Sequence, residues 1–317
     1  MEEFLECLPY FDVGTNYWIV RSGVNSMFFD EFNRKEQIAL GWNLIDNLDT
    51  IKNSFNVEEI KSIVEAKYAT LLQQLSKKQE TNIKRRVSDI SGKIDRFVNK
   101  VNVGDIVLTP SKEDVLIGEV LTDTYIVNDL YKNESDDLEN LIIGDLNKIR
   151  DVKWVKKISR DKLEPNLKLI LNVNHGIAHI ENEQVITEIN RCLYNFYIKG
   201  NQGHSIFRIK TQDEIDFDKY ALFIHHAYGL YNVLKGDYTN ERLSIKANIQ
   251  SPGPVEFIGK ASLVGEMSIA LFSLFKNDDA ILQKLDIEKQ EKIKSYKKQN
   301  PVEEELEDYE FPYEGEY

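Results

Sequence analysis

The residues best suited to binding chemistry are aromatic side chains near an arginine in the first half of the chain. All three tryptophans, Trp18, Trp42 and Trp154, lie there. An indole face can stack on a planar ring, and stacking on a nucleic-acid base contributes about 1–3 kcal/mol. Arg21 can donate two parallel hydrogen bonds to a phosphate or to the edge of a base. We therefore expect a base- or nucleotide-binding site formed by Trp18, Arg21, Ser22, Phe28, Trp42, Tyr125 and Trp154.

Catalytic patterns are incomplete by comparison. His175 and His179 have the spacing of two metal ligands on one helix face, but Gly176 interrupts the pair and no third ligand is evident. Glu65 and Lys67 form a Glu-x-Lys pattern inside an expected helix, whereas a metal-dependent nuclease holds it on adjoining strands. A glycine-rich phosphate loop with lysine and a Gly-x-Ser-x-Gly turn are both absent from the sequence. The sequence thus predicts no catalytic residue, no metal and no cofactor.

The negative charge of the chain is concentrated at its end. Residues 303–317 hold eight acidic residues and no basic one, so they account for −8 of the formal net charge of −13 and leave −5 for the rest. Residues 77–100 carry a local charge of +5. Binding of a polyanion depends on such a local patch rather than on the total charge. We expect phosphate contacts from Lys84, Arg85 and Arg86, although most charge runs are only solvated faces.

The elements that would position these residues alternate between strands and helices. Residues 17–21 and 38–42 read as strands, followed by a helix that Asn56 caps and Glu59 completes as a capping box. A second amphipathic helix covers about residues 87–101. Further strands are expected at residues 106–108, 115–120, 124–127 and 151–155. Short strands interleaved with helices predict a small, partly closed β-barrel with flanking helices.

The second half has a different pattern. Helices are expected near residues 185–196, 217–234, 261–275 and 280–299, with strands at 243–249 and 255–259. The acidic aromatic tail should be disordered. We therefore expect an α+β protein with a recognition domain (1–165), a mixed but largely helical domain (166–300) and a tail (301–317).

Processing and membrane signals are missing from the sequence. No apolar run reaches the roughly 18 residues that span a bilayer, and residues 1–6 lack the basic region of a signal peptide. Two cysteines, Cys7 and Cys192, cannot form a disulfide framework. We expect a cytoplasmic protein without membrane contact.

A series of short motifs in the first half resembles the N-terminal domain of Mrr-like restriction proteins, a PUA-like module related to the EVE, YTH and ASCH families. The resemblance covers about residues 14–180. It implies a small β-barrel whose aromatic pocket accepts a nucleobase, often modified and flipped out of a duplex. The nuclease domain that commonly follows in that family is not recognisable in the second half. The matching positions include Trp18, Arg21, Trp42, Gly104, Asp105, Gly118, Tyr125 and Trp154.

These observations favour a non-enzymatic recognition component of a prokaryotic restriction or anti-phage defence system. Its partner would be DNA, another nucleic acid or a nucleotide, and it could also bind a protein of the same operon or a second copy of itself. Two alternatives stay open. Residues 180–300 could hide the motif of a nuclease or nucleotide hydrolase, or the acidic tail, with Tyr309, Phe311, Tyr313 and Tyr317, could mimic DNA and inhibit a partner. The aromatic residues could also simply fill the core of a barrel.

Overall fold

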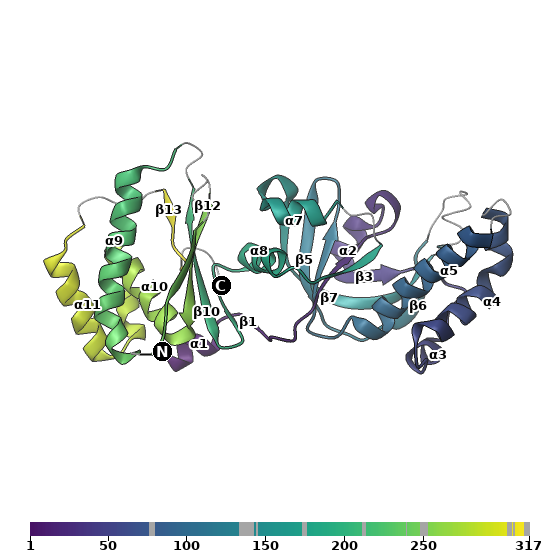
Figure 1. The fold of residues 1–317 in the computed structure, drawn as a ribbon, viewed down its shortest axis with the longest axis horizontal. Coiled ribbons are helices and arrows are strands. Elements are labelled where there is room, and N and C mark those ends of the chain that lie inside the picture. The colour runs from purple at the N-terminus through teal and green to yellow at the C-terminus, as the bar shows by residue number, and fades with distance from the viewer. Residues whose placement is uncertain are drawn as a thin grey trace. The chain divides into compact units, whose positions relative to one another are not determined.

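The computed structural model describes residues 1–75, 80–132, 143, 145–172, 176–210, 214–238, 240–247, 253–302, 306 and 308–313. Contacts divide the chain into two compact units (Figure 1). We call Thr15–Ile189 the half-barrel unit, and Met1–Gly14 together with Asn190–Tyr317 the terminal unit. In the described part of the chain, no helix combines the length and apolar character needed to cross a bilayer.

The half-barrel unit is built on a seven-stranded mixed sheet. The strand order is β3-β7-β5-β4-β2-β8, and β6 pairs with β7. Strands β2 and β4 run parallel, and the other pairs are antiparallel. The strands are β2 (Tyr17–Val20), β3 (Gln37–Leu40), β4 (Ile106–Pro110), β5 (Asp114–Val120), β6 (Tyr125–Tyr131), β7 (Leu146–Ser159) and β8 (Ile177–Ile180).

The long strand β7 bends this sheet because its two halves have different neighbours. Residues 148–151 pair with β3, and residues 152–159 pair with β5. The register shifts where Gly118 faces Trp154. A Cβ at Gly118 would lie 2.5 Å from the carbonyl oxygen of Lys153 and 2.8 Å from the Trp154 ring. Glycine therefore allows the close approach, and the irregularity adds curvature.

Two long helices, α4 (Val57–Leu75) and α5 (Glu80–Asp95), pack side by side next to the sheet (Figure 1). Asn56 Oδ1 accepts hydrogen bonds from the backbone N–H groups of Glu58 and Glu59 at the start of α4. The Glu59 carboxylate accepts a hydrogen bond from the backbone N–H of Phe55, one residue before the cap. The predicted cap is therefore confirmed. Helix α5 continues into a π-helix, Arg96–Lys100. The other helices are α2 (Phe29–Lys35), α3 (Leu48–Lys52), α7 (Pro165–Ile170) and α8 (Glu183–Leu193).

The terminal unit contains a sheet of six strands, so the expectation of a largely helical second domain is wrong. The order is β1-β9-β10-β12-β11, and β13 pairs with β10. Helices α9, α10 and α11 gather on one side of this sheet (Figure 1). The strands are β1 (Tyr10–Phe11), β9 (Phe196–Lys199), β10 (Gln202–Ile209), β11 (Ser244–Ala247), β12 (Gly253–Lys260) and β13 (Tyr309–Glu310). The helices are α1 (Glu2–Glu6), α9 (Phe217–Leu234), α10 (Ala261–Phe275) and α11 (Ile287–Gln299).

The acidic tail enters the core of the terminal unit, and the expectation of a disordered tail is also wrong where the structure describes it. Strand β13 adds to the sheet with Tyr309 opposite Ile209. Leu306, Tyr309 and Phe311 are buried. The Phe311 ring lies 5.5 Å from that of Phe207. Carboxylates dominate the composition of this segment, but its apolar side chains are spaced so that they face inward together.

Candidate functional site

The half-barrel unit gathers the five aromatic candidates around one hydrophobic core. Trp18, Phe28 and Trp42 belong to this core, and Tyr125 and Trp154 pack against it. The burial of these rings is compatible with both readings of the sequence, a barrel core and a binding pocket. What separates the rings is the hydrogen bonding of their polar atoms.

Trp18 is a core residue whose polar atom is satisfied. Its side chain is 4% exposed, and Nε1 donates to Asp105 Oδ2 over 2.8 Å. The other carboxylate oxygen of Asp105 accepts the backbone N–H of Asn16. Asp105 thus ties β2 to the turn before β4. His179 lies in β8 with its ring 4.6 Å from the Trp18 ring, whereas His175 lies outside the described residues.

Trp154 and Tyr125 also have their polar atoms bonded within the protein. Trp154 Nε1 donates to the carbonyl oxygen of Phe32 over 2.8 Å. The Tyr125 hydroxyl donates to Asp151 Oδ1 over 2.7 Å. Burial, followed by this bond to Asp151, raises the pKa of Tyr125 to about 12. Both side chains therefore have a structural role that needs no ligand.

Trp42 differs from the other two tryptophans. Its backbone has φ +59°, in the left-handed region that a bulky side chain rarely adopts. The side chain is 6% exposed, and its Nε1 is buried without a hydrogen-bond partner among the residues described. Ser22 also has a buried polar atom without a partner, because its Oγ is fully buried and no described group bonds to it. Trp42 and Ser22 therefore each keep a buried, unused hydrogen-bonding atom.

A buried lysine holds the Trp42 loop in place. Lys148 Nζ donates to the carbonyl oxygens of Gly41 (3.0 Å) and Trp42 (2.9 Å) and to Asn147 Oδ1. Burial lowers the pKa of Lys148 to about 7. The backbone N–H of Trp42 donates to the carbonyl oxygen of Ile143, and a Cβ at Gly41 would collide with that same oxygen. The loop is therefore fixed at both residues.

Lys93 lies near both Trp42 and Gly176, the residue before β8. Its Nζ lies 5.5 Å from the centroid of the Trp42 ring, and it forms an ion pair of 2.6 Å with Asp89. A Cβ at Gly176 would lie 3.3 Å from Lys93 Cε. The carbonyl oxygen of Gly176 accepts the backbone N–H of Arg21, the residue before Ser22. Lys93 thus lies close both to the Trp42 ring and to Gly176, the hydrogen-bond partner of Arg21.

The other expected cations lie at different places. The Arg21 guanidinium donates to the carbonyl oxygen of Leu171 over 2.9 Å, and burial lowers its pKa. Lys84 and Arg85 are exposed on α5, and Arg86 is half-buried. At 1.5 Å per residue these three precede Lys93 by about 10–14 Å along the helix. The cation that lies over the Trp42 ring, Lys93, is thus one that the sequence analysis did not single out.

Lys148 and Lys93 are the residues that sequence reasoning missed here. Positions 146, 148, 150 and 152 are spaced by two residues and therefore lie on one face of a strand. This places two cations, Lys148 and Arg150, on the same face as Leu146 and Val152. That pattern was a readable signal of buried charge. Lys93 had no comparable signal, because a lysine on an amphipathic helix is ordinary.

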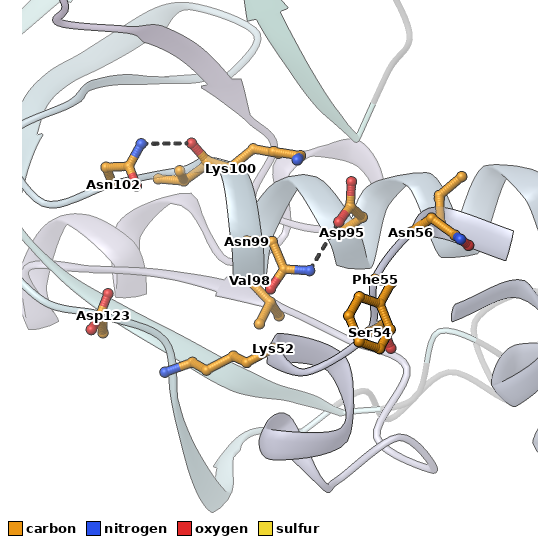
Figure 2. Close-up of a pocket in the computed structure, with 12 residues that line it drawn as sticks. Lys52, Ser54, Phe55, Asn56, Asp95, Val98, Asn99, Lys100, Asn102 and Asp123 are labelled. Atoms are coloured by element: carbon orange, nitrogen blue, oxygen red, sulfur yellow. Dashed lines mark hydrogen bonds between the residues drawn. The ribbon is translucent and has the colours of Figure 1, made fainter. Parts of the chain in front are cut away.

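A separate hollow of about 430 Å³ lies elsewhere in the half-barrel unit (Figure 2). Lys52 and Phe55 line one side of it, and Asn99 and Lys100 of the π-helix line another. The sequence analysis used the neighbouring Asn56 cap but did not single out Phe55, whose ring is 94% exposed.

The terminal unit contains a buried polar cluster around Glu256. This carboxylate accepts hydrogen bonds from Arg191 Nε (3.2 Å) and the Tyr197 hydroxyl (3.3 Å) and bonds to His204 Nδ1 (2.8 Å). Burial alone would raise the pKa of Glu256, but the bond to His204 and the charge of Arg191 lower it. The carboxylate is fully buried, which leaves it no surface for a substrate. The described residues contain no group of three or more His, Cys, Asp or Glu side chains arranged to hold a metal ion.

Comparison of the chain with protein-family models and with curated proteins found no match.

Proposed function

We propose that the half-barrel unit is a non-enzymatic recognition module that binds a nucleobase, in DNA or as a nucleotide, at the Trp42 loop. The observation that supports it is the buried indole N–H of Trp42, which lacks an acceptor in the described structure. A buried donor without a partner costs about 1–3 kcal/mol. A ring nitrogen or carbonyl oxygen on the edge of a base is an acceptor that would remove this cost.

The surroundings of Trp42 also suit a base and its phosphate. The Lys93 ammonium lies 5.5 Å from the ring centroid and is paired with Asp89 through flexible side chains. A base that accepts the indole N–H lies in the plane of the ring, so the Lys93 ammonium can stay over the ring face. From there the ammonium would be placed to pair with the phosphate of the same nucleotide. Ser22 Oγ would supply a further donor or acceptor to the ligand.

The biological setting of this proposal comes from the resemblance to Mrr-like restriction proteins. A role in prokaryotic restriction or anti-phage defence, action in the cytoplasm, and a partner protein or second copy belong to the same proposal. They would place the terminal unit in transmitting a binding event. A binding measurement on the purified chain tests the first step alone.

The experiment compares Trp42→Phe with Trp154→Phe in binding to methylated and unmodified oligonucleotides. Both changes remove an indole N–H and keep an aromatic ring, but the N–H of Trp154 already bonds to Phe32. We expect Trp42→Phe to weaken binding about tenfold, the value of one net hydrogen bond, at an unchanged dependence on salt. Trp154→Phe should leave the affinity unchanged. Equal affinities of the wild type and Trp42→Phe, with both proteins folded by thermal unfolding, would refute the proposal.

A further inference from the structure

The solvent-facing side of α9 lacks the charged residues that a surface helix normally carries. From Tyr220 to Leu234, a stretch of about four turns, the sequence contains no aspartate, glutamate, lysine or arginine. A helix on the surface of a soluble protein ordinarily has a charged or polar face opposite its apolar face, and a helix that is apolar on all sides is ordinarily covered on all sides. The composition of α9 therefore indicates an interface rather than a solvated surface.

Two aromatic rings dominate the solvent-facing side of α9. Phe217 is 79% exposed and Tyr228 is 65% exposed, and Ala221 between them is exposed as well. Their spacings of four and seven residues place the three positions on one face of a helix with 3.6 residues per turn. We call Phe217, Ala221 and Tyr228 the outer face of α9. The opposite face is buried and holds Phe223, His226, Ala227, Leu230 and Leu234.

The outer face is preformed, because α9 is fixed at its start and along its inner side. Asp216 Oδ1 accepts hydrogen bonds from the backbone N–H groups of Asp218 (2.9 Å) and Lys219 (3.2 Å). The helix packs against α10 and α11 (Figure 1). On the inner side, His226 Nδ1 lies 3.2 Å from the hydroxyl oxygen of Tyr296 in α11. A surface that is already ordered loses little conformational entropy when it binds.

The outer face is complementary to itself in size. A twofold axis midway between positions 221 and 228 would place Ala221 of each copy of α9 opposite Tyr228 of the other copy, with the two helices antiparallel. A small residue facing a large one lets the helices approach and interdigitate their side chains. The contact is reciprocal, as the interface of a twofold dimer requires.

The charges at the ends of α9 also favour the antiparallel order. Asp218 is exposed in the first turn, and Lys235 is exposed directly after the last turn. In an antiparallel pair the end with Asp218 lies beside the end with Lys235, whereas a parallel pair would bring like charges together. Antiparallel order also opposes the two helix dipoles. Between these ends, no charged side chain of α9 repels a second copy.

From this pattern we propose that the outer face of α9 is the interface of a homodimer, in which α9 pairs with α9 of a second copy in antiparallel order. A second copy fits this face better than a nucleic acid or an anionic membrane, because those partners bind through lysine and arginine, which the face lacks. The interface is independent of the base binding proposed at Trp42.

The exposed rings set the expected strength of the dimer. Aromatic side chains bury roughly 200 Å² each, so the exposed parts of Phe217 and Tyr228 would bury together about 300 Å² per copy. A standard interface buries about 800 Å² per partner. Because the remaining area must come from the smaller residues around the rings, we expect a reversible dimer with a Kd on the order of micromolar.

Sedimentation velocity of the full chain, at concentrations from well below to well above this Kd, measures the association. Tyr228→Asp places a carboxylate in the interface, where it would lose its hydration without gaining a partner. Phe55→Asp is the matched control, because it makes the same kind of change at a 94% exposed ring in the half-barrel unit. We expect Tyr228→Asp to weaken the dimer at least about tenfold and Phe55→Asp to leave it unchanged. Thermal unfolding checks that both variants are folded.

Ala221→Phe separates the antiparallel pairing from unspecific association of an apolar surface. A larger ring at position 221 would collide with Tyr228 of the second copy, so we expect the dimer to weaken. In an unspecific association the added apolar area would strengthen binding instead. A chain that stays monomeric over the whole concentration range, a dimer that Tyr228→Asp does not weaken, or a dimer that Ala221→Phe strengthens would each overturn the inference. None of these results affects the proposal for Trp42, which is measured by base binding.

Discussion

Replacement of Lys148 by methionine should remove a pH dependence from the stability of the half-barrel unit. Lys148 is fully buried, and its ammonium donates to the carbonyl oxygens of Gly41 and Trp42. Burial disfavours the charged form and lowers the pKa from 10.5 to about 7, while the charge of Asp46 offsets this only in part. The folded protein therefore releases a proton from Lys148 at a pH where the unfolded chain still holds it.

The sign and size of the effect follow from this difference. Between pH 7 and 10.5 the unfolded chain binds more protons than the folded chain, so the free energy of unfolding rises with pH in this window. The penalty for burying the charge is fully present below pH 7 and is relieved as the pH rises. A difference of this size corresponds to about 5 kcal/mol in total, at most about 1.4 kcal/mol per pH unit. Methionine has a similar length and no charge, so the variant lacks this slope.

Urea unfolding of the wild type and Lys148→Met at pH 7 to 10 measures the effect. The variant leaves the carbonyl oxygens of Gly41 and Trp42 without their donor, a separate cost of about 1–3 kcal/mol that does not change with pH. The wild type alone should become more stable, relative to the variant, as the pH rises from 7 to 10. Lys153→Met changes an exposed position of the same strand, so its free energy of unfolding should change with pH in parallel with that of the wild type. Parallel curves for the wild type and Lys148→Met would show that the buried charge is not penalised as argued.

Two further predictions concern the terminal unit. Phe311→Ala should lower the free energy of unfolding by about 3–5 kcal/mol, because the ring is fully buried. A denaturant titration in which the variant is as stable as the wild type would contradict the placement of the tail in the core. Glu256→Gln should destabilise the protein at pH 7. Because the pKa of Glu256 is held below its ordinary value, the stability from the ionised carboxylate is present above pH 4.5 and is lost as the pH falls through the folded-state pKa. The deficit of the variant should therefore shrink in unfolding curves recorded toward pH 3, and a constant deficit from pH 7 to 3 would exclude this origin.

The helices were predictable where a local signal marks their ends. The ranges expected for α9 and α10, residues 217–234 and 261–275, coincide with the helices observed. Asp216 caps α9 through its side chain, and α10 is a continuous apolar run that follows directly on β12. Local sequence sets such boundaries because caps and apolar periodicity act within a few residues. The strand in the acidic tail could not be predicted in this way, because its pairing with β10 joins residues about a hundred positions apart.

The candidate site was predictable in residue type but not in role. The sequence alone does not distinguish Trp18, Trp42 and Trp154, because each is an indole near a β-rich segment. Their roles separate only through the partner of each N–H. Trp18 bonds to Asp105, 87 positions away, and Trp154 bonds to Phe32, 122 positions away. A pattern of neighbouring residues contains no information on bonds of this range.

Two separate energetic penalties meet at the Trp42 loop, which is why this loop supports the proposal better than the other tryptophans do. A bulky residue in the left-handed region is strained by about 1–3 kcal/mol, and the glycine that would relieve the strain is instead at position 41. The carbonyl oxygen of the strained residue is then held by a lysine whose burial is itself unfavourable. A loop that served packing alone would be more stable with a smaller residue at position 42 and an apolar one at position 148. Local rules are broken twice at this one place, and the binding that we propose would account for both, since the strained and buried groups would then fix one indole edge for a ligand.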